Sequence, residues 1–163
     1  MPKYLLGLDA GNTVIKAVIF DLEGRELAHA GQEGKSRMPR PGHVERDLGE
    51  FWENAKRVIA TCLEKAGIAA SDIAAIGCAG HGNGLYALDR DGEPLIGIQS
   101  IDTRATGLVE EWAAQGVGDR TYPIGRQRPW PAQTPTLLAW LKRSEPALFQ
   151  RIEPDRVLSV AAF

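Results

Sequence analysis

The segment between Asp47 and Gly67 constrains the fold most, because its pattern predicts one long amphipathic helix. Its apolar residues recur at intervals of three and four, which places them on one helical face. Asp47 and Glu50 have the spacing of a capping box, and Gly67 stands where a C-terminal glycine cap belongs. The pattern therefore predicts a helix of about 19 residues. The expected buried stripe comprises Leu48, Phe51, Trp52, Ala55, Val58, Ile59, Cys62, Leu63 and Ala66.

Short apolar runs on both sides of this helix predict β-strands. Before the helix, three consecutive strands are predicted over residues 4–9, 14–20 and 26–32. The second of them is apolar on both faces, which predicts a strand that is buried on both sides. After the helix, further strands are predicted over residues 73–79, 85–88 and 96–101.

The remaining segments are predicted to be loops and shorter helices. Residues 36–47 and 116–133 are rich in polar residues and proline, which is typical of loops. One helix is predicted over residues 105–115. Another begins with Thr134 as N-cap and Pro135 at the first helical position. Residues 156–160 start a new apolar run, and the sequence shows no strand that would pair with it. This mixture of strands and helices is that of an α/β domain that is incomplete.

Composition narrows the functions that the chain can have. Its 163 residues suit one domain or part of a larger one, and 19 basic against 21 acidic residues leave a net charge of −2. This balance gives no support for a nucleic-acid surface, and no apolar stretch approaches the ~20 residues that span a bilayer. Because no signal-peptide pattern is present, a cytoplasmic location is expected by default. Cys62 and Cys78 do not form a CxxC pair, so we expect two reduced, buried thiols and no zinc site.

The turn between the first two predicted strands carries the clearest candidate chemistry. A carboxylate such as Asp9, at the end of a buried strand, can hold a hydrated Mg²⁺, and Gly11 lets backbone N–H groups approach phosphate oxygens. The Thr13 hydroxyl and Lys16 add a hydrogen-bond donor and a compensating charge. These residues suit phosphoryl transfer, where catalysis rests on positioning and electrostatics. The alternative is a plain hairpin in which Asp9 only forms the turn.

Four separated motifs, in the right order, resemble the FGGY family of carbohydrate kinases. The turn at residues 9–13 is similar to the first phosphate motif of the actin, hexokinase and heat-shock ATPase superfamily. The other three segments are PGHVERD, GHGNGL and IQSIDTR, which resemble the family's PGWxEQD, GQMHGL and WNDxR segments. Within the family, the chain resembles the L-xylulose kinases, which also have a glycine-rich turn in place of QMHG. The resemblance implies an actin-like ATPase (ribonuclease H-like) fold, a mixed sheet flanked by helices. Residues 1–163 would be the N-terminal part of its first domain.

The resemblance implies ATP and Mg²⁺ as cofactors, and a small sugar or polyol as the substrate. Asp9 would hold the metal through water. The phosphates and their charge would be met by Gly11, Asn12, Thr13 and Lys16. The sugar would be faced by residues of two loops, namely His81, Gly82, Asn83, Asp102 and Arg104. Since the chain departs from the family's usual residues at these loops, the preferred sugar stays open.

The sugar-facing residues also have plainer interpretations. His81 also fits a surface or loop histidine whose ring forms hydrogen bonds only with neighbouring residues of the protein. Asn83 suits a left-handed turn with no ligand. Asp102 and Arg104 suit a helix N-cap and its exposed neighbour.

The resemblance finally implies an activity, and it implies that parts of the active site lie outside this sequence. The expected reaction transfers the γ-phosphoryl group of ATP to a hydroxyl of a ketopentose such as xylulose or of a related polyol. The general base is expected beyond Phe163 and the adenosine site in a second domain, so no catalytic residue is assigned here and the fragment should be nearly inactive alone. The alternatives are a relative of the type III pantothenate kinases, which share the D-x-GNT turn, and a non-catalytic sugar-binding fragment. An unpaired sheet edge would favour self-association, so a homodimer is considered as well.

Overall fold

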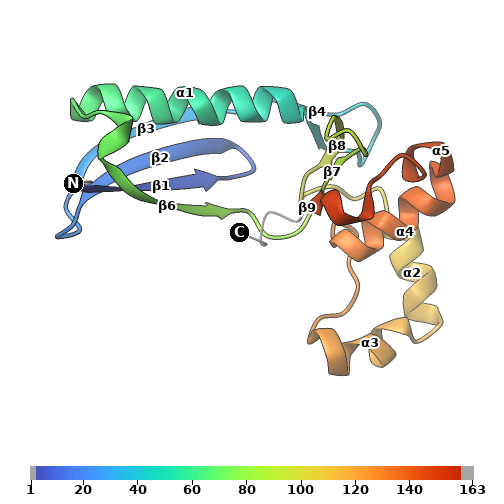
Figure 1. Ribbon diagram of the computed structural model, residues 1–163. Helices are drawn as coiled ribbons and strands as arrows, with labels where there is room; N and C mark the ends of the chain where they lie inside the picture. Colours follow the sequence, from blue (N-terminus) through green and yellow to red (C-terminus); the bar gives the residue numbers. More distant parts are fainter. Residues whose placement is uncertain (1–2, 159–163) are drawn as a thin grey trace. The chain divides into compact units, whose positions relative to one another are not determined.

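The computed structural model describes residues 3–158, which form two compact units (Figure 1). Unit 1 comprises residues 3–35 and 47–81, and unit 2 comprises residues 36–46 and 82–158. In the described part of the chain, no helix is both long and apolar enough to cross a membrane.

Unit 1 is a four-stranded mixed sheet in the order β3-β2-β1-β6. Its strands are β1 (Tyr4–Ala10), β2 (Val14–Asp21), β3 (Glu26–Glu33) and β6 (Ile73–Gly80). The first three strands pair as antiparallel hairpins, whereas β6 lies parallel to β1. Because parallel neighbours need a long crossover, the chain passes through helix α1 (Leu48–Ala66) between β3 and β6. All four strands confirm the sequence predictions to within a residue or two.

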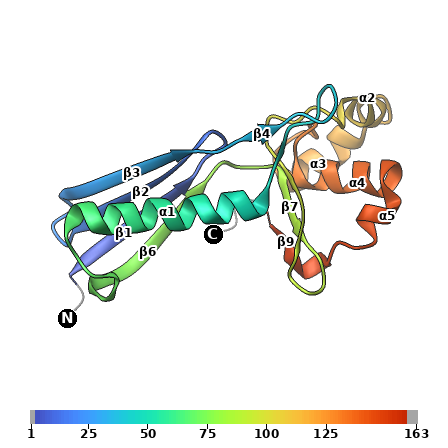
Figure 2. The same ribbon diagram turned by 90° about the horizontal axis from the view of Figure 1, so that it is seen from above.

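Helix α1 covers one face of this sheet, as Figure 2 shows from above. Both predicted caps are confirmed. The Asp47 side chain accepts a hydrogen bond from the Glu50 N–H at 2.9 Å, and Gly67 adopts a left-handed φ of 65°. The buried core between helix and sheet consists of Leu6, Ile15, Ala17, Ile19, Ala30, Ala55, Val58 and Cys62.

Three expectations about burial in unit 1 are wrong, two of them because the other face of the sheet is open. Strand β2 is fully buried on one side only. Ile15, Ala17 and Ile19 pack in the core beneath α1, whereas Lys16 lies on the opposite face and is exposed. Cys78 is exposed on β6, so only Cys62 is a buried thiol. Trp52 is 62% exposed, because it lies beside the stripe of α1 that packs on the sheet. Among the described residues of unit 1, only α1 supplies a covering helix, and it contacts a single face.

The two cysteines are expected to differ sharply in reactivity with a thiol reagent. Cys78 should react as a free thiol, whereas Cys62 is fully buried and burial raises the pKa of its thiol. Native protein should therefore release about one equivalent of thionitrobenzoate from Ellman's reagent quickly, and about two after denaturation. Cys78→Ser should remove the fast phase. Fast labelling of both thiols in native protein would contradict the packing of α1 on the sheet.

Unit 2 contains a second sheet, with strand order β4-β5-β8-β7-β9 and antiparallel pairing throughout. Its strands are β4 (Ser36–Arg37), β5 (Glu45–Arg46), β7 (Leu85–Leu88), β8 (Pro94–Ile98) and β9 (Val157–Leu158). Strand β8 ends three residues before the predicted Ile101, because the Asp102 N–H bonds back to the Gln99 carbonyl at 3.0 Å and turns the chain. The apolar run near the C-terminus does have a partner, since Val157 pairs with Ala87; its residues 159–160 lie outside the described part.

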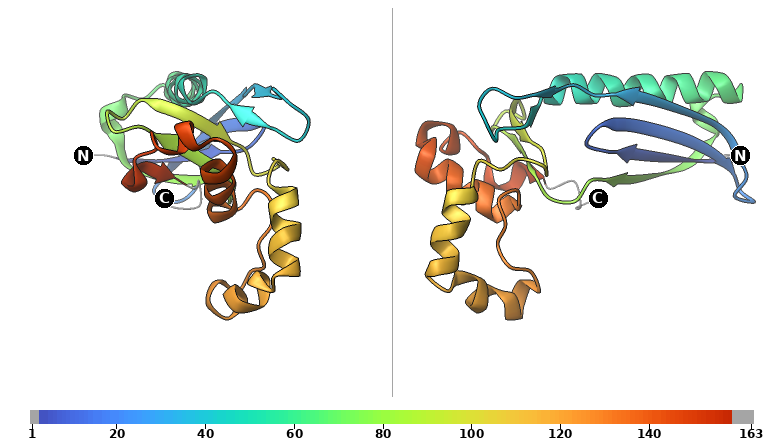
Figure 3. Two further views of the ribbon diagram at one scale, coloured as in Figure 1. Left: turned by 90° about the vertical axis from the view of Figure 1, so that its right-hand side faces the viewer. Right: turned by 180° about the vertical axis from the view of Figure 1, so that it is seen from behind.

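Helices α2 (Thr106–Ala114), α3 (Val117–Gly125), α4 (Thr134–Ser144) and α5 (Pro146–Phe149) belong to unit 2. Helix α3 corrects the prediction of a loop over residues 116–133. Gly116, at a φ of 67°, turns the chain between α2 and α3 (Figure 3). Pro123 lies inside α3, where it lacks the N–H for one helical hydrogen bond, and α3 ends two residues later. Helix α4 is capped by Gln133, one residue earlier than predicted, so Thr134 is its first helical residue. The core of unit 2 consists of Leu85, Ala87, Ile98, Leu137, Leu141 and Ile152.

Candidate functional site

The candidate phosphate turn joins β1 to β2 in unit 1. Asp9 pairs with Lys16 across the two strands, and both side chains lie on the face opposite α1 because side chains alternate along a strand. On this face they border a recess of about 340 Å³, whose lining also includes Gly7, Gly77 and Ala79. Strands therefore place a carboxylate and an ammonium group side by side at the edge of an open, glycine-lined surface.

The backbone of this turn leaves no room for a side chain at Gly11. Its N–H donates to the Val14 carbonyl at 3.2 Å, and a Cβ at this position would lie 2.8 Å from the same oxygen. The Gly34 N–H donates to the Thr13 carbonyl at 2.9 Å and ties the turn to the end of β3. The turn is thus a tight stretch of main chain in which Gly11 has no side chain and its N–H is bonded within the hairpin.

His81 follows β6 and stays in unit 1, beside the phosphate turn. Its ring Nδ1 lies 3.2 Å from the Ala10 carbonyl, which makes Nδ1 the donor of that hydrogen bond. Gly82 and Asn83 belong to unit 2. The loop predicted to face the sugar is therefore divided between the two units, and His81 is positioned by the end of β1.

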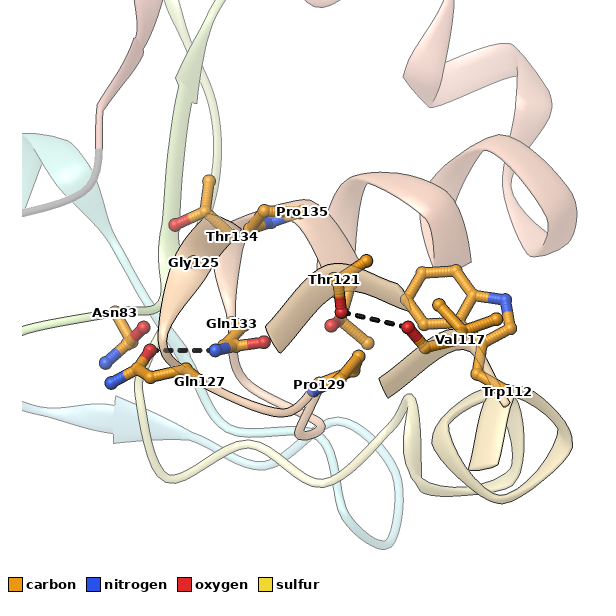
Figure 4. A pocket seen from close by; sticks show the side chains of 11 residues that line it. Asn83, Trp112, Val117, Thr121, Gly125, Gln127, Pro129, Gln133, Thr134 and Pro135 are labelled. Carbon is orange, nitrogen blue, oxygen red and sulfur yellow. Dashed lines mark hydrogen bonds between the residues drawn. The ribbon is translucent and has the colours of Figure 1, made fainter. Parts of the chain in front are cut away.

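Unit 2 holds a pocket of about 410 Å³ beside Asn83 (Figure 4). The pocket is built by the end of α2, by α3, by the loop that follows α3 and by the first turn of α4. Its lining contains no charged side chain and consists of Asn83, Trp112, Val117, Thr121, Gly125, Gln127, Pro129, Gln133, Thr134, Pro135 and Thr136. A mostly apolar concavity with a few fixed polar groups is the usual form of a small-molecule site.

Two long-range hydrogen bonds hold Asn83 at this pocket. The Gly84 N–H donates to the Ala132 carbonyl at 2.8 Å, and the Thr134 hydroxyl donates to the Gly84 carbonyl at 2.8 Å. Asn83 has a φ of 67°, and a Cβ on Gly84 would lie 2.6 Å from the Ile98 carbonyl. Asn83 is thus a left-handed turn residue and a pocket residue at once, so its two interpretations do not exclude each other.

Sequence reasoning missed Gln127, Gln133 and Thr136, which also line the pocket. Gln133 donates from Nε2 to Gln127 Oε1 at 2.9 Å and accepts from the Trp130 N–H at 3.3 Å. The only sequence signal of Gln127 and Gln133 was a position between prolines in a segment predicted to be a loop, whereas Thr136 belonged to a predicted helix. Helix α3 turns that segment into a pocket wall.

Asp102 and Arg104 lie together in a buried ion-pair network. The Arg104 side chain is 1% exposed, and its Nε and Nη2 each lie 2.9 Å from one oxygen of Asp102. Nη2 also lies 2.8 Å from Glu45 Oε1, while Asp102 accepts from the Val44 N–H at 2.6 Å. The guanidinium stacks over the Trp140 ring, 5.4 Å from its centroid.

This network overturns the plainer interpretation of the two residues. Ala105 precedes the first residue of α2 as its N-cap, so Asp102 is not the cap, and Arg104 is not exposed. The network joins Val44 and the first residue of β5, Glu45, to the turn after β8 and to Trp140 of α4. His43 packs edge-on against Trp140, and desolvation together with the charge of Arg104 lowers its pKa. A direct contact of Asp102 or Arg104 with sugar stays a prediction.

Comparison with known proteins identifies similar chains. The FGGY family of carbohydrate kinases, N-terminal domain, matches residues 4–162. A probable L-xylulose kinase of Pasteurella multocida is 37% identical over 150 residues, and the L-xylulose/3-keto-L-gulonate kinase of Escherichia coli is 37% identical over 153. These matches cover 91% and 93% of this chain but only 31% of each relative.

Solved structures agree on the fold. The xylulose kinase of Rhodospirillum rubrum superposes with a TM-score of 0.86 at 27% identity, over 97% of this chain and 32% of that one. The gluconate kinase of Lactobacillus acidophilus, at 23% identity, has a TM-score of 0.88 and shows the fold alone. The expected α/β fold with a mixed sheet flanked by helices is confirmed.

Proposed function

The chain belongs to the FGGY family of carbohydrate kinases, and we propose that it carries the phosphate turn and the sugar-facing loop of an ATP-dependent kinase. The proposed acceptor is a hydroxyl of a ketopentose such as xylulose, or of a related polyol. One observation carries this proposal beyond family membership. Asp9 and Lys16 face each other on an open surface beside the bare backbone of Gly11, which is the arrangement that a polyphosphate and its metal need.

The residues present fit the expected cofactors. Mg²⁺ binds through one or two carboxylates together with water and substrate phosphates, so Asp9 suffices as the protein's contribution. Within residues 3–158 no cluster of three acidic, histidine or cysteine side chains offers a cage for the metal. When bound, Mg-ATP supplies the transferable phosphoryl group. Asp9 would orient the hydrated metal, the turn at Gly11, Asn12 and Thr13 would meet the phosphates, and Lys16 would balance their charge.

A second candidate function is sugar binding without phosphoryl transfer. The pocket beside Asn83 is built entirely from unit 2, so it does not depend on the phosphate turn. We assign no general base to residues 3–158, and the chain spans about 31% of the curated relatives' length. The 163-residue chain is therefore expected to bind a sugar but to turn over little or none.

The first test is thermal unfolding of the 163-residue chain with pentuloses, polyols and sugar acids, each with and without Mg-ATP. A sugar at 100 times its Kd stabilises by about 2.7 kcal/mol, which corresponds to a rise in Tm of about 5–10 °C for a chain of this size. A rise in Tm that is specific to one sugar supports sugar binding by the pocket beside Asn83. A turnover number of about 1–100 s⁻¹ from this chain alone would contradict its expected inactivity.

Activity itself needs a longer protein. We define a chimera in which this chain replaces the matching N-terminal 31% of the Escherichia coli relative. The chimera is expected to phosphorylate L-xylulose. A folded chimera that binds sugar and nucleotide yet transfers no phosphate would favour the binding function over the kinase.

A further inference from the structure

Asn83, which lines the pocket of unit 2, is followed directly by Gly84. It is the one asparagine of the three in the sequence that precedes a glycine, because Asn12 and Asn54 precede residues with a side chain. Glycine has no side chain that would hinder its backbone nitrogen, and its backbone is the most permissive. Asn83 is therefore the asparagine whose side-chain amide can react most readily with the backbone of the next residue.

The reaction that this pair permits is intramolecular deamidation, which needs only water. The Gly84 nitrogen loses its proton and attacks Cγ of Asn83, so that an N–Cγ bond forms between two groups that adjoin in the chain. The Cγ–Nδ2 bond then breaks, and the departing NH₂ group takes up a proton and leaves as ammonia. Water opens the resulting succinimide at either carbonyl carbon, which leaves aspartate or isoaspartate at position 83.

The fold restrains the nitrogen that this reaction requires. The Gly84 N–H donates to the Ala132 carbonyl at 2.8 Å, and Gly84 is buried. Removal of the N–H proton would break this bond and leave a carbonyl without its donor. The Thr134 hydroxyl donates to the Gly84 carbonyl at 2.8 Å and fixes the other side of the same residue. While both bonds are in place, Gly84 is hindered from losing its proton.

Close packing of the backbone adds a second restraint. A Cβ on Gly84 would lie 2.6 Å from the Ile98 carbonyl oxygen and 3.2 Å from the Ser100 nitrogen, so the glycine lies directly against the end of β8 and the turn after it. The backbone of Gly84 thus has little room to move, whereas ring closure draws its nitrogen toward the Asn83 side chain. Native packing and the reaction therefore oppose each other.

We propose that Asn83 is a deamidation site that the fold suppresses while residues 82–84 are bonded to residues 132–134, and that reacts when these two segments separate. Local opening of a structure exposes groups that the closed form protects, and its population follows the free energy of opening. The modification therefore accumulates in molecules whose pocket loop has come apart. This inference goes beyond the proposed function and does not depend on it.

The two products should affect the fold differently. Isoaspartate adds a carbon to the main chain before Gly84, in a stretch whose length is fixed by the bonds to Ala132 and Thr134. Aspartate keeps the native main chain, and it tolerates the left-handed φ of 67° that Asn83 adopts. Isoaspartate is therefore expected to destabilise unit 2, whereas aspartate should leave its unfolding temperature near that of wild type.

The test is peptide mapping by mass spectrometry after incubation of the 163-residue chain at mildly alkaline pH, with and without urea. Deamidation replaces an NH group by oxygen, and chromatography separates the aspartate and isoaspartate peptides. Asn83 should react at least about tenfold more slowly in the native chain than in urea, because only opened molecules react. Asn12 and Asn54 are internal controls that should react more slowly than Asn83 in urea.

Thr134→Val tests the restraint itself, because it removes the hydroxyl that bonds the Gly84 carbonyl and keeps the shape of the side chain. It should speed native deamidation by about two- to tenfold, the range for one lost hydrogen bond, and leave the rate in urea unchanged. Hydrogen exchange of the Gly84 N–H measures the opening directly and should accelerate in parallel. Thr106→Val is the matched control, since its hydroxyl bonds the Thr103 carbonyl at 2.7 Å, and it should change neither rate.

The purified isoaspartate form should unfold at a lower temperature than wild type, and Asn83→Asp should not. Equal rates of deamidation in the native chain and in urea would overturn the proposal, as would faster reaction at Asn12 or Asn54. It would also be wrong if Thr134→Val speeds hydrogen exchange at Gly84 without speeding deamidation. None of these measurements depends on sugar binding or kinase activity, so the proposed function is judged separately.

Discussion

Asp9→Asn in the chimera is expected to lower kcat by at least about 10²–10³-fold, the range seen when one preorganised electrostatic group is lost from an active site. The reason is the position of the carboxylate opposite Lys16 on the open face of the sheet, where it would orient the hydrated metal. The substitution keeps the shape of the side chain, so strand β1 should be preserved. The pocket beside Asn83, which is the proposed sugar site, is formed by residues of unit 2, so the Kd for sugar should stay within about twofold of the parent.

The matched control is Asp21→Asn, at the opposite end of the same hairpin. Asp21 closes the turn to Arg25 through hydrogen bonds to backbone N–H groups and to the guanidinium. This control should leave kcat near the parent value. Steady-state kinetics and sugar titration give kcat and the Kd for sugar of both variants. If Asp9→Asn lost sugar binding and kept kcat at saturation, the metal role of Asp9 would be wrong.

Arg104→Met is expected to lower the free energy of unfolding by about 3–5 kcal/mol. The substitution leaves the carboxylates of Asp102 and Glu45 without their cation, and Asp102 is fully shielded from solvent. It also removes the guanidinium from the Trp140 ring. Denaturant unfolding followed by tryptophan fluorescence measures the change.

Arg143→Met provides the control on the same unit. Arg143 pairs with Glu111 at 2.6 Å, but both side chains are about half exposed, so its loss should cost less than about 1 kcal/mol. If Arg104→Met were as stable as this control yet bound no sugar, Arg104 would be a sugar ligand rather than the centre of a structural network.

Local patterns predicted unit 1 well, because each signal acts over a few neighbouring residues. Asp47 reaches the Glu50 N–H three positions away, and Gly67 caps the same helix at its other end. The hairpin of β1 and β2 follows from two apolar runs and a glycine turn. Burial was predicted less well, since Trp52 on α1 and Cys78 on β6 have core-like sequence contexts but are exposed.

Unit 2 was harder to predict because its organisation depends on contacts between distant residues. Glu45 meets Arg104 across 59 positions, and Gly84 meets Thr134 across 50. Glycine and proline indicated a loop over residues 116–133, but Gly116 turns the chain between two helices and Pro123 lies in the last turn of α3. The pocket residues Gln127, Gln133 and Thr136 carry no motif by which they could be recognised.

The sequence by itself determined the four strands and the capped helix α1 of unit 1, the tight turn between β1 and β2, and the family, since each of these rests on short motifs of neighbouring residues. Only the tertiary structure decided which groups are buried. It placed Asp102 and Arg104 inside an ion-pair network, assembled the uncharged pocket around Asn83, and left the Thr136 hydroxyl buried without a partner among the described residues. The physical reason is that burial and charge compensation depend on which distant segments pack together, and that packing has no local signature.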